Sequence, residues 1–240
     1  VYLHGIDAAL CVNNYSQCET AAIAGLKDER FLERYRRDLA CPGCPNDCIK
    51  VIHPRTAARL DERASGIHQE VSGTMAITIG VTDIDVMLRA NNRCNELGLD
   101  PTSLGFTIAF AMELFEKGIL TAADDGGQAL HFGDGEGALA MIERIARRDG
   151  LGDTLAEGTR RATERIGRGS GRYAMHVKGV EMVCFEPRSQ TNLATGYAVA
   201  PVGPRYDICE HDWDFDTLVG WDHTLRLART LGILQRIPMN

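Results

Sequence analysis

Apolar residues between positions 82 and 98 recur at the spacing of one helical face. The segment TDIDVMLRANNRCNELG opens with Thr82 or Asp83, either of which can cap a helix, and it closes with Gly98. Glycine is the residue favoured in the left-handed position after a helix. The apolar positions at helical spacing are Ile84, Met87, Leu88, Cys94 and Leu97. The pattern predicts an amphipathic helix that ends at Gly98.

A second helix is predicted directly after the first. Asp100 is a capping residue, and Pro101 suits the first helical position because an N–H there would have no partner. Lys117-Gly118 closes the pattern. We expect one apolar face, made of Leu104, Ile108, Ala111, Met112 and Phe115. A glycine-rich turn over 126–137 and helices near 136–148 and 154–166 follow. The groups GDGEG and GRGSG lack the spacing of a phosphate-binding loop and are predicted to be turns between helices.

The pattern changes near Tyr173. The segment YAMHVKGVEMVCFEPR alternates apolar and polar residues around a glycine and predicts a short extended segment. A Gly/Pro loop, APVGPRYDICEHDWDFD, comes next, and a further helix is expected to carry Leu225, Leu227, Ala228 and Leu231. We therefore predict a mainly α protein with few short strands, divided into a helical domain over 1–173 and a second domain over 174–240.

Composition and charge exclude two classes of partner. The 240 residues carry a formal net charge of −7, and 44% of them are apolar, as is usual for globular proteins. No stretch approaches the ~20 apolar residues of a membrane helix, and an acidic chain is poorly suited to a phosphate backbone. We expect a cytoplasmic protein that binds neither membrane nor nucleic acid. Because the chain starts at Val1 and ends without a helix stop, we also expect a piece of a longer protein, with a site that other segments complete.

The sharpest chemical signal is the segment Cys41-Pro-Gly-Cys44-Pro-Asn-Asp-Cys48. Three thiolates within eight residues can converge on one centre, either zinc or a [4Fe–4S] cluster, and each centre needs a fourth ligand from elsewhere. Zinc sites favour a second C-x-x-C pair, which this chain lacks, so iron–sulfur is favoured. A redox pair at Cys41 and Cys44 would leave Cys48 without a role. The scattered cysteines are expected to be small buried apolar residues: Cys11, Cys18, Cys94 and Cys184.

The order of several motifs resembles the aldehyde ferredoxin oxidoreductase family. The motifs are CPGCPNDC, Glu70 before VSGTMAITIGV, NELGLD, TIAFAMELFEKGIL, GLGDTLAEG and HVKGVEM. The resemblance implies the helical domains of that family and a tungsten or molybdenum ion held by two pterins. It also implies a [4Fe–4S] cluster that passes electrons to ferredoxin or another iron–sulfur electron carrier, and a small aldehyde-like substrate. The sequence leaves the choice between a monomer and a homo-oligomer open. The fourth cluster cysteine and the β-rich N-terminal domain lie outside the chain.

The resemblance also assigns roles to residues. Cys41, Cys44 and Cys48 would be three cluster ligands. A pterin-binding loop would contain Asn95, Gly98, Leu99 and Asp100. Read without the family, the same loop is a glycine C-cap joined to an aspartate N-cap. In the family the motif opens with Asp, so Asn95 keeps an acceptor and loses the charge.

Two residues would belong to the substrate pocket. Glu70 would handle protons, because aldehyde oxidation with water releases them, although by itself it reads as a solvated glutamate at a helix start. His211 would be the second catalytic residue. The loop VGPRYDICEHD departs from the family, however, so that either Asp207 replaces the pocket histidine or His211 fills its place through an insertion.

Three hypotheses follow. The first is an oxidoreductase that oxidises an aldehyde to a carboxylic acid. The second is a non-catalytic iron–sulfur or zinc binding module. The third is a zinc hydrolase that uses His211 and the neighbouring carboxylates, although such an acidic run is more often a solvated loop.

Overall fold

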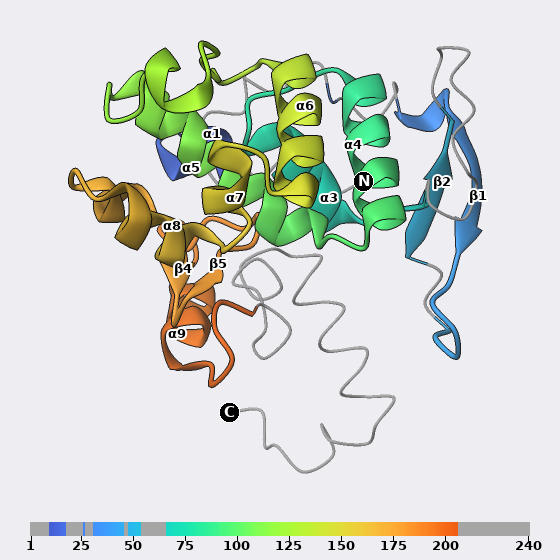
Figure 1. The fold of residues 1–240 in the computed structure, drawn as a ribbon. Coiled ribbons are helices and arrows are strands. Elements are labelled where there is room, and N and C mark those ends of the chain that lie inside the picture. The colour runs from blue at the N-terminus through green and yellow to red at the C-terminus, as the bar shows by residue number, and fades with distance from the viewer. Residues whose placement is uncertain (1–9, 18–25, 27–30, 46–47, 54–65, 206–240) are drawn as a thin grey trace, which may run out of the picture.

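The chain forms a mainly helical body with few short strands in a computed structural model, which confirms the predicted fold class (Figure 1). The structure describes residues 10–17, 26, 31–45, 48–53 and 66–205. Its α-helices are α1 (Val12–Tyr15), α3 (Gln69–Ser72), α4 (Ile84–Leu97), α5 (Pro101–Glu116), α6 (Gly135–Arg147), α7 (Leu151–Leu155), α8 (Thr159–Ile166) and α9 (Thr191–Val199). A π-helix, η2 (Gly73–Ile77), continues α3, and 3-10 turns occupy η3 (Ala122–Asp125) and η4 (Ser170–Tyr173).

Within the described residues, five short strands form two antiparallel sheets. One sheet has the order β1 (Tyr35–Leu39), β2 (Ile49–Ile52) and β3 (Gly66–Ile67). It lies beside α4 at one edge of the body in Figure 1, where Asn91 Nδ2 donates to Gly66 O at 3.1 Å. The other is a hairpin of β4 (His176–Val177) and β5 (Val180–Glu181).

The two predicted helices around position 99 are confirmed, together with their caps. Asp83 Oδ1 accepts from Asp85 N at 2.8 Å, and Gly98 ends α4 with a φ of 69°. The Asp100 carboxylate accepts from the backbone N–H groups of Thr102 and Ser103 at 3.0 and 3.2 Å. Each cap satisfies backbone groups that a helix end leaves without a partner.

The expected single apolar face of α5 is wrong, because α5 is buried on every side. All residues from Leu104 to Phe115 are buried. Most belong to the main core, which contains the inward faces of α4 and α6. Phe106 points to a second, smaller cluster that holds Cys11, Tyr15 and Cys184. A helix that is apolar all round is the centre of a fold, and α5 therefore separates and supports two apolar clusters.

The helix expected over 154–166 is two helices, α7 and α8, which Gly158 separates. Gly158 has a φ of 81°, and a Cβ there would lie 2.9 Å from Glu181 Oε1. The same Glu181 oxygen accepts from Thr159 N at 2.7 Å and Thr159 Oγ1 at 3.0 Å. A carboxylate from β5 thus caps α8, and this tertiary contact breaks the helix.

The region after Tyr173 contains the predicted extended segment as the β4–β5 hairpin, and it adds helix α9, which the pattern did not predict. The expected helix around Leu225 lies outside the described residues. The division at 173/174 stays a prediction.

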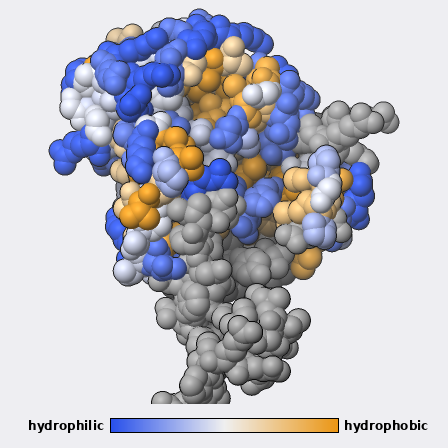
Figure 2. Space-filling model, turned by 90° about the horizontal axis from the view of Figure 1, so that it is seen from below, coloured by the Kyte–Doolittle hydropathy of each residue, from blue (hydrophilic) through white to orange (hydrophobic). Residues whose placement is uncertain are grey.

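The surface mixes polar and apolar side chains in separate patches, as Figure 2 shows from below. The large apolar side chains that are exposed are Leu32, Tyr35, Val180, Val199 and Val202. Within the described ranges, no helix has the length and apolar character needed to cross a membrane.

Candidate active site

The three clustered cysteines lie on the connection between β1 and β2. Cys41 and Cys48 are exposed and Cys44 is half-buried, and all three are free thiols. Cys44 N donates to Cys41 O at 3.0 Å, and Gly43 adopts a φ of 78°, so the segment turns tightly between the two thiols. Among residues 41–45 and 48 and the other described parts of the chain, no three His, Cys, Asp or Glu side chains form a group that could hold a metal ion. The assignment of Cys41, Cys44 and Cys48 as cluster ligands therefore stays a prediction.

Glu70 is a buried carboxylate and not the solvated residue that its sequence context alone suggests. It lies in the first turn of α3 with 7% of its surface exposed. His68 caps this helix, because its Nδ1 accepts from Glu70 N at 3.4 Å. Thr74 Oγ1 donates to Glu70 O at 2.9 Å. Hydrogen bonds at both backbone groups hold Glu70 at the junction of α3 and the π-helix.

The Glu70 carboxylate contacts a buried thiol from a distant segment. Cys184 Sγ donates to Glu70 Oε2 at 3.1 Å. The contact is close because position 73 is glycine: a Cβ at Gly73 would lie 2.7 Å from Cys184 Sγ and closer still to Cys184 Cβ. π-helical turns occur frequently at functional sites. Here Glu70 lies on the turn directly before the π-helix, and Cys184 packs against the first residue of the π-helix, Gly73.

A second buried thiol lies near the same carboxylate. Cys11 Sγ and Thr78 Oγ1 are 2.7 Å apart. Burial raises the pKa of Cys11 to about 12, and the negative charges of Glu70 and Glu186 act in the same direction. Burial also raises the pKa of Cys184 far above its ordinary value, and the charge of Glu70 adds to this shift. These raised pKa values favour the protonated form of both thiols.

The predicted pterin loop is exposed and regular. Asn95, Gly98 and Asp100 are exposed, and Leu99 is half-buried. Leu99 N donates to Cys94 O at 2.9 Å, which closes the end of α4, and the Asp100 carboxylate caps α5. The structure thus brings the four residues together as a cap-to-cap turn, and their role toward a pterin stays a prediction.

The predicted His211, with Asp207 and the other carboxylates of its loop, lies outside the described residues. The burial expected for three of the scattered cysteines is confirmed for Cys11, Cys94 and Cys184, whereas Cys18 is not described. Of the two glycine groups predicted to be turns, GRGSG has left-handed residues at Gly167 and Gly169 and leads into η4. In GDGEG only Gly133 and the cap residue Asp134 precede α6, so the prediction of a turn is wrong for the rest of that group.

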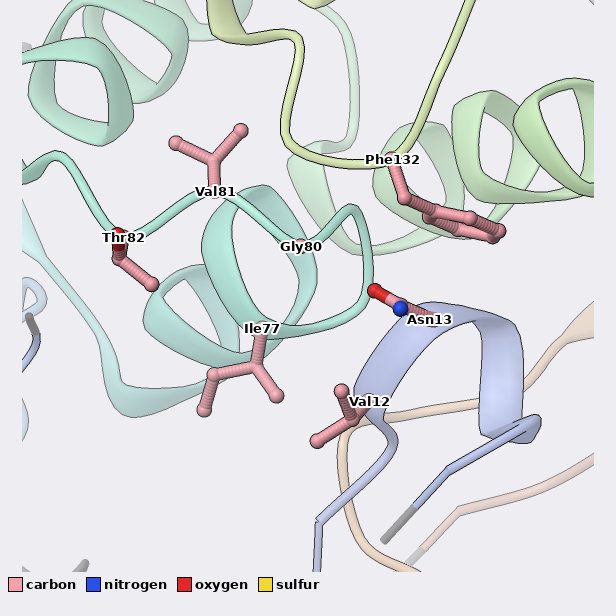
Figure 3. A pocket seen from close by; sticks show the side chains of 7 residues that line it. All are labelled: Val12, Asn13, Ile77, Gly80, Val81, Thr82 and Phe132. Atoms are coloured by element: carbon pink, nitrogen blue, oxygen red, sulfur yellow. The ribbon is translucent and has the colours of Figure 1, made fainter. Parts of the chain in front are cut away.

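A cavity of about 120 Å³ lies apart from these residues, between α1 and the loop after the π-helix (Figure 3). Val12, Ile77, Val81 and Phe132 form its apolar walls, and Asn13 projects toward Gly80. None of the predicted site residues that the structure describes lines it.

Sequence reasoning missed the contact between Cys184 and Glu70. The pattern correctly predicted a small buried residue, but burial of a cysteine gives no information about its partner. Glu70 and Cys184 are separated by 114 positions. The glycine at position 73, one turn after Glu70, is the only nearby signal, and a single glycine does not identify what packs against it.

The sequence of this chain is similar to a family model and to several named proteins. A family model described as aldehyde ferredoxin oxidoreductase, domains 2 and 3, matches residues 4–228. The tungsten-containing aldehyde ferredoxin oxidoreductase of Thermococcus kodakarensis is 37% identical over 164 residues, which is 68% of this chain and 26% of the relative. The aliphatic sulfonate oxidoreductase, WOR-like subunit, of Pyrococcus furiosus is 29% identical over 195 residues, 79% of this chain and 31% of the relative.

A solved structure is also similar. The active site complex BamBC of benzoyl coenzyme A reductase, solved with 1,5-dienoyl-CoA, matches with a TM-score of 0.61 and 27% identity, over 76% of this chain and 27% of that chain. The chain spans about a quarter of the length of the tungsten-containing relatives that it matches.

Proposed function

Because this chain belongs to the aldehyde ferredoxin oxidoreductase family, we propose that it forms the part of such an oxidoreductase that holds the cluster cysteines, one pterin loop and a proton-handling carboxylate. The proposed reaction oxidises an aldehyde to a carboxylic acid. Electrons leave through a [4Fe–4S] cluster to ferredoxin. The observation that carries the proposal is Glu70, a buried carboxylate at the position that the family resemblance gives to proton handling.

The donor set of the β1–β2 connection suits an iron–sulfur cluster. Cys41, Cys44 and Cys48 are free thiols at or near the surface, and a [4Fe–4S] cluster takes one thiolate for each iron. The fourth ligand would come from outside the chain.

The loop between α4 and α5 suits a polar heterocycle. Its exposed residues lie between the cap of α4 and the cap of α5, and the Asn95 side chain adds amide donors and an acceptor. A tungsten or molybdenum ion held by two pterins would supply a two-electron acceptor for the substrate. The tungsten-containing relatives favour tungsten.

Glu70 would take a proton during turnover. Oxidation of an aldehyde with water gives the acid, two electrons and two protons, and a carboxylate shielded from solvent can receive a proton at working pH. The burial of Glu70 at 7% exposure and its fixed backbone suit this role. His211 is proposed as the second pocket residue.

The substrate is the least constrained part of the proposal. One relative is named for aliphatic sulfonates, and the similar solved structure was obtained with a dienoyl-CoA. Reduction of an aromatic CoA thioester is therefore a second candidate reaction, and an assay panel needs both substrate classes.

Metal analysis and variants test the proposal on the full-length protein. We expect iron together with tungsten or molybdenum, and dye reduction that depends on aldehyde. Cys44→Ala should lose cluster iron, whereas Cys184→Ala, as a matched control, should keep it. Glu70→Gln should lower the turnover rate. Zinc without iron, tungsten or molybdenum would refute the proposal, and equal iron loss in both cysteine variants would refute the ligand assignment.

A further inference from the structure

We propose that Cys184 is a positioning residue for Glu70: its thiol donates to Oε2 and fixes the plane of the carboxylate for proton transfer. The inference rests on the proposed function, because it assumes that Glu70 handles protons. Cys184 lies outside the family motifs and is not one of the cysteines proposed to bind the iron–sulfur cluster.

The contact is direct and buried. The sulfur of Cys184 lies 3.1 Å from Glu70 Oε2, and the two residues are 5% and 7% exposed. A thiol is a weak donor to neutral acceptors, but hydrogen bonds to an ionised acceptor are about twice as strong as neutral ones. Water cannot easily replace the donor at this depth, so the thiol has a larger influence on the carboxylate than it would have at the surface.

Both partners are fixed by close backbone packing. Gly73 leaves no space between the π-helix and Cys184, since any Cβ would overlap the cysteine side chain. On the other side, Gly105 of α5 lies against Thr74, where a Cβ would be 2.5 Å from Thr74 O. Glycine contacts on two sides hold the π-helix, and with it the turn that carries Glu70. The distance between Glu70 and Cys184 is therefore set by the core rather than by flexible side chains.

The protonation states agree with a thiol donor. The pKa of Cys184 is raised far above its ordinary value by burial first and by Glu70 second, so its proton stays on sulfur. Cys11 and Tyr15, which belong to the same cluster, also have raised pKa values because of burial. Glu186 is paired with Arg188 at 2.6 Å.

The experiment compares four variants of the protein with its cofactors bound: Cys184→Ala, Cys184→Ser, Cys11→Ala and Glu70→Gln. Cys11→Ala is the matched control, because it removes an equally buried thiol from the same cluster that bonds Thr78 instead of Glu70. The readouts are kcat, KM, the pH profile of kcat/KM, and the infrared S–H stretching band of Cys184, which is identified by its absence in Cys184→Ala. Thermal melting confirms that each variant is folded.

We expect Cys184→Ala to lower kcat with KM little changed and to move the acidic limb of the profile to higher pH. On that limb kcat/KM should fall about five-fold, because one hydrogen bond that stabilises the ionised carboxylate is lost. Cys184→Ser should restore the limb, since a hydroxyl also donates, and Cys11→Ala should leave it in place. The S–H band should shift in Glu70→Gln. Such a shift reports the contact independently of turnover.

The outcomes separate the two proposals. The positioning role is wrong, and the proposed function stands, if Glu70→Gln loses activity while Cys184→Ala keeps the acidic limb of the wild-type pH profile. The positioning role is also wrong if the S–H band is the same in Glu70→Gln and in wild type. If Glu70→Gln is as active as wild type, the proton-handling role and the positioning role are both wrong.

Discussion

Replacing Gly73 by alanine perturbs the closest packing contact next to Glu70. The backbone itself would tolerate the change, because Gly73 has an ordinary helical φ of −67° and alanine is favoured over glycine in helices by about 1 kcal/mol. The new methyl group, however, would lie 2.7 Å from Cys184 Sγ. The methyl group would lie closer still to Cys184 Cβ. Non-bonded heavy atoms prefer roughly 3.5–4.0 Å, so the two segments must separate by more than about 1 Å.

The clash decides the sign of the effect. Forcing an extra carbon into a packed core costs about 1–3 kcal/mol, and an overlap with both Cβ and Sγ of Cys184 places the cost in the upper part of this range, above the gain in helix propensity. We therefore expect Gly73→Ala to lower the free energy of unfolding by about 1–2 kcal/mol and to break the bond between Cys184 and Glu70. The matched control is Gly171→Ala, where a Cβ meets nothing within 4 Å, and there we expect a change within about 0.5 kcal/mol.

A double-mutant cycle with Cys184→Gly identifies the partner. In the double variant the new Cβ would lie 3.6 Å from the Cα of residue 184, which is an ordinary contact. Gly73→Ala should then cost less in the Cys184→Gly background, with a coupling energy of about 1 kcal/mol or more in denaturant unfolding. If Gly73→Ala lowers the free energy of unfolding equally in the two backgrounds, Cys184 does not pack against Gly73, and this packing cannot fix the position of Glu70.

Three further predictions concern the frame around the site. Asp134→Ala removes the cap that accepts from Gly137 N at 2.9 Å and should lower stability by about 1 kcal/mol in thermal melts; an unchanged melting temperature would contradict the cap. Glu181→Ala leaves Thr159 with a buried N–H and hydroxyl that lack their acceptor, and should cost about 2–4 kcal/mol in denaturant unfolding; a loss below 1 kcal/mol would mean that another group caps α8. Burial raises the pKa of Glu113 above its ordinary value of 4.5. At pH values above 4.5 the buried carboxylate therefore lowers the free energy of unfolding, because its ionised form is less stable in the folded state than in the unfolded chain. Glu113→Gln should stabilise the protein at neutral pH and have no effect at acidic pH, and a stabilisation that is equal at both would contradict the pKa shift.

The caps of the long helices could be predicted because they depend on near neighbours in the chain. Asp83 and Asp100 bond N–H groups two or three residues away, and Gly98 adopts the left-handed conformation that glycine permits. Each signal is complete within a few residues. The bounds of α4 and α5 agree with the pattern for this reason.

Features that depend on distant contacts could not be predicted. The break between α7 and α8 needs Glu181, which lies 22 residues beyond Thr159. The π-helix needs contacts with Cys184 and with Gly105. The full burial of α5 depends on Phe106, whose neighbours Cys11 and Cys184 come from opposite ends of the described chain. A periodicity shows which residues prefer the interior, but not how many sides of a helix will find a partner.

The same distinction applies to the candidate site. The resemblance marks Glu70 and the loop Asn95–Asp100, and the structure gives them opposite environments: Glu70 is buried, and most of the loop is exposed. Burying a carboxylate costs free energy unless polar groups compensate for the lost water, so the contacts around Glu70 have to be built into this part of the fold. The exposed loop has no such requirement, because its cap hydrogen bonds already satisfy its backbone groups and water reaches its side chains. The packing of the described chain therefore fixes the carboxylate that is proposed to handle protons, whereas the loops that are proposed to hold cofactors lie mostly at the surface.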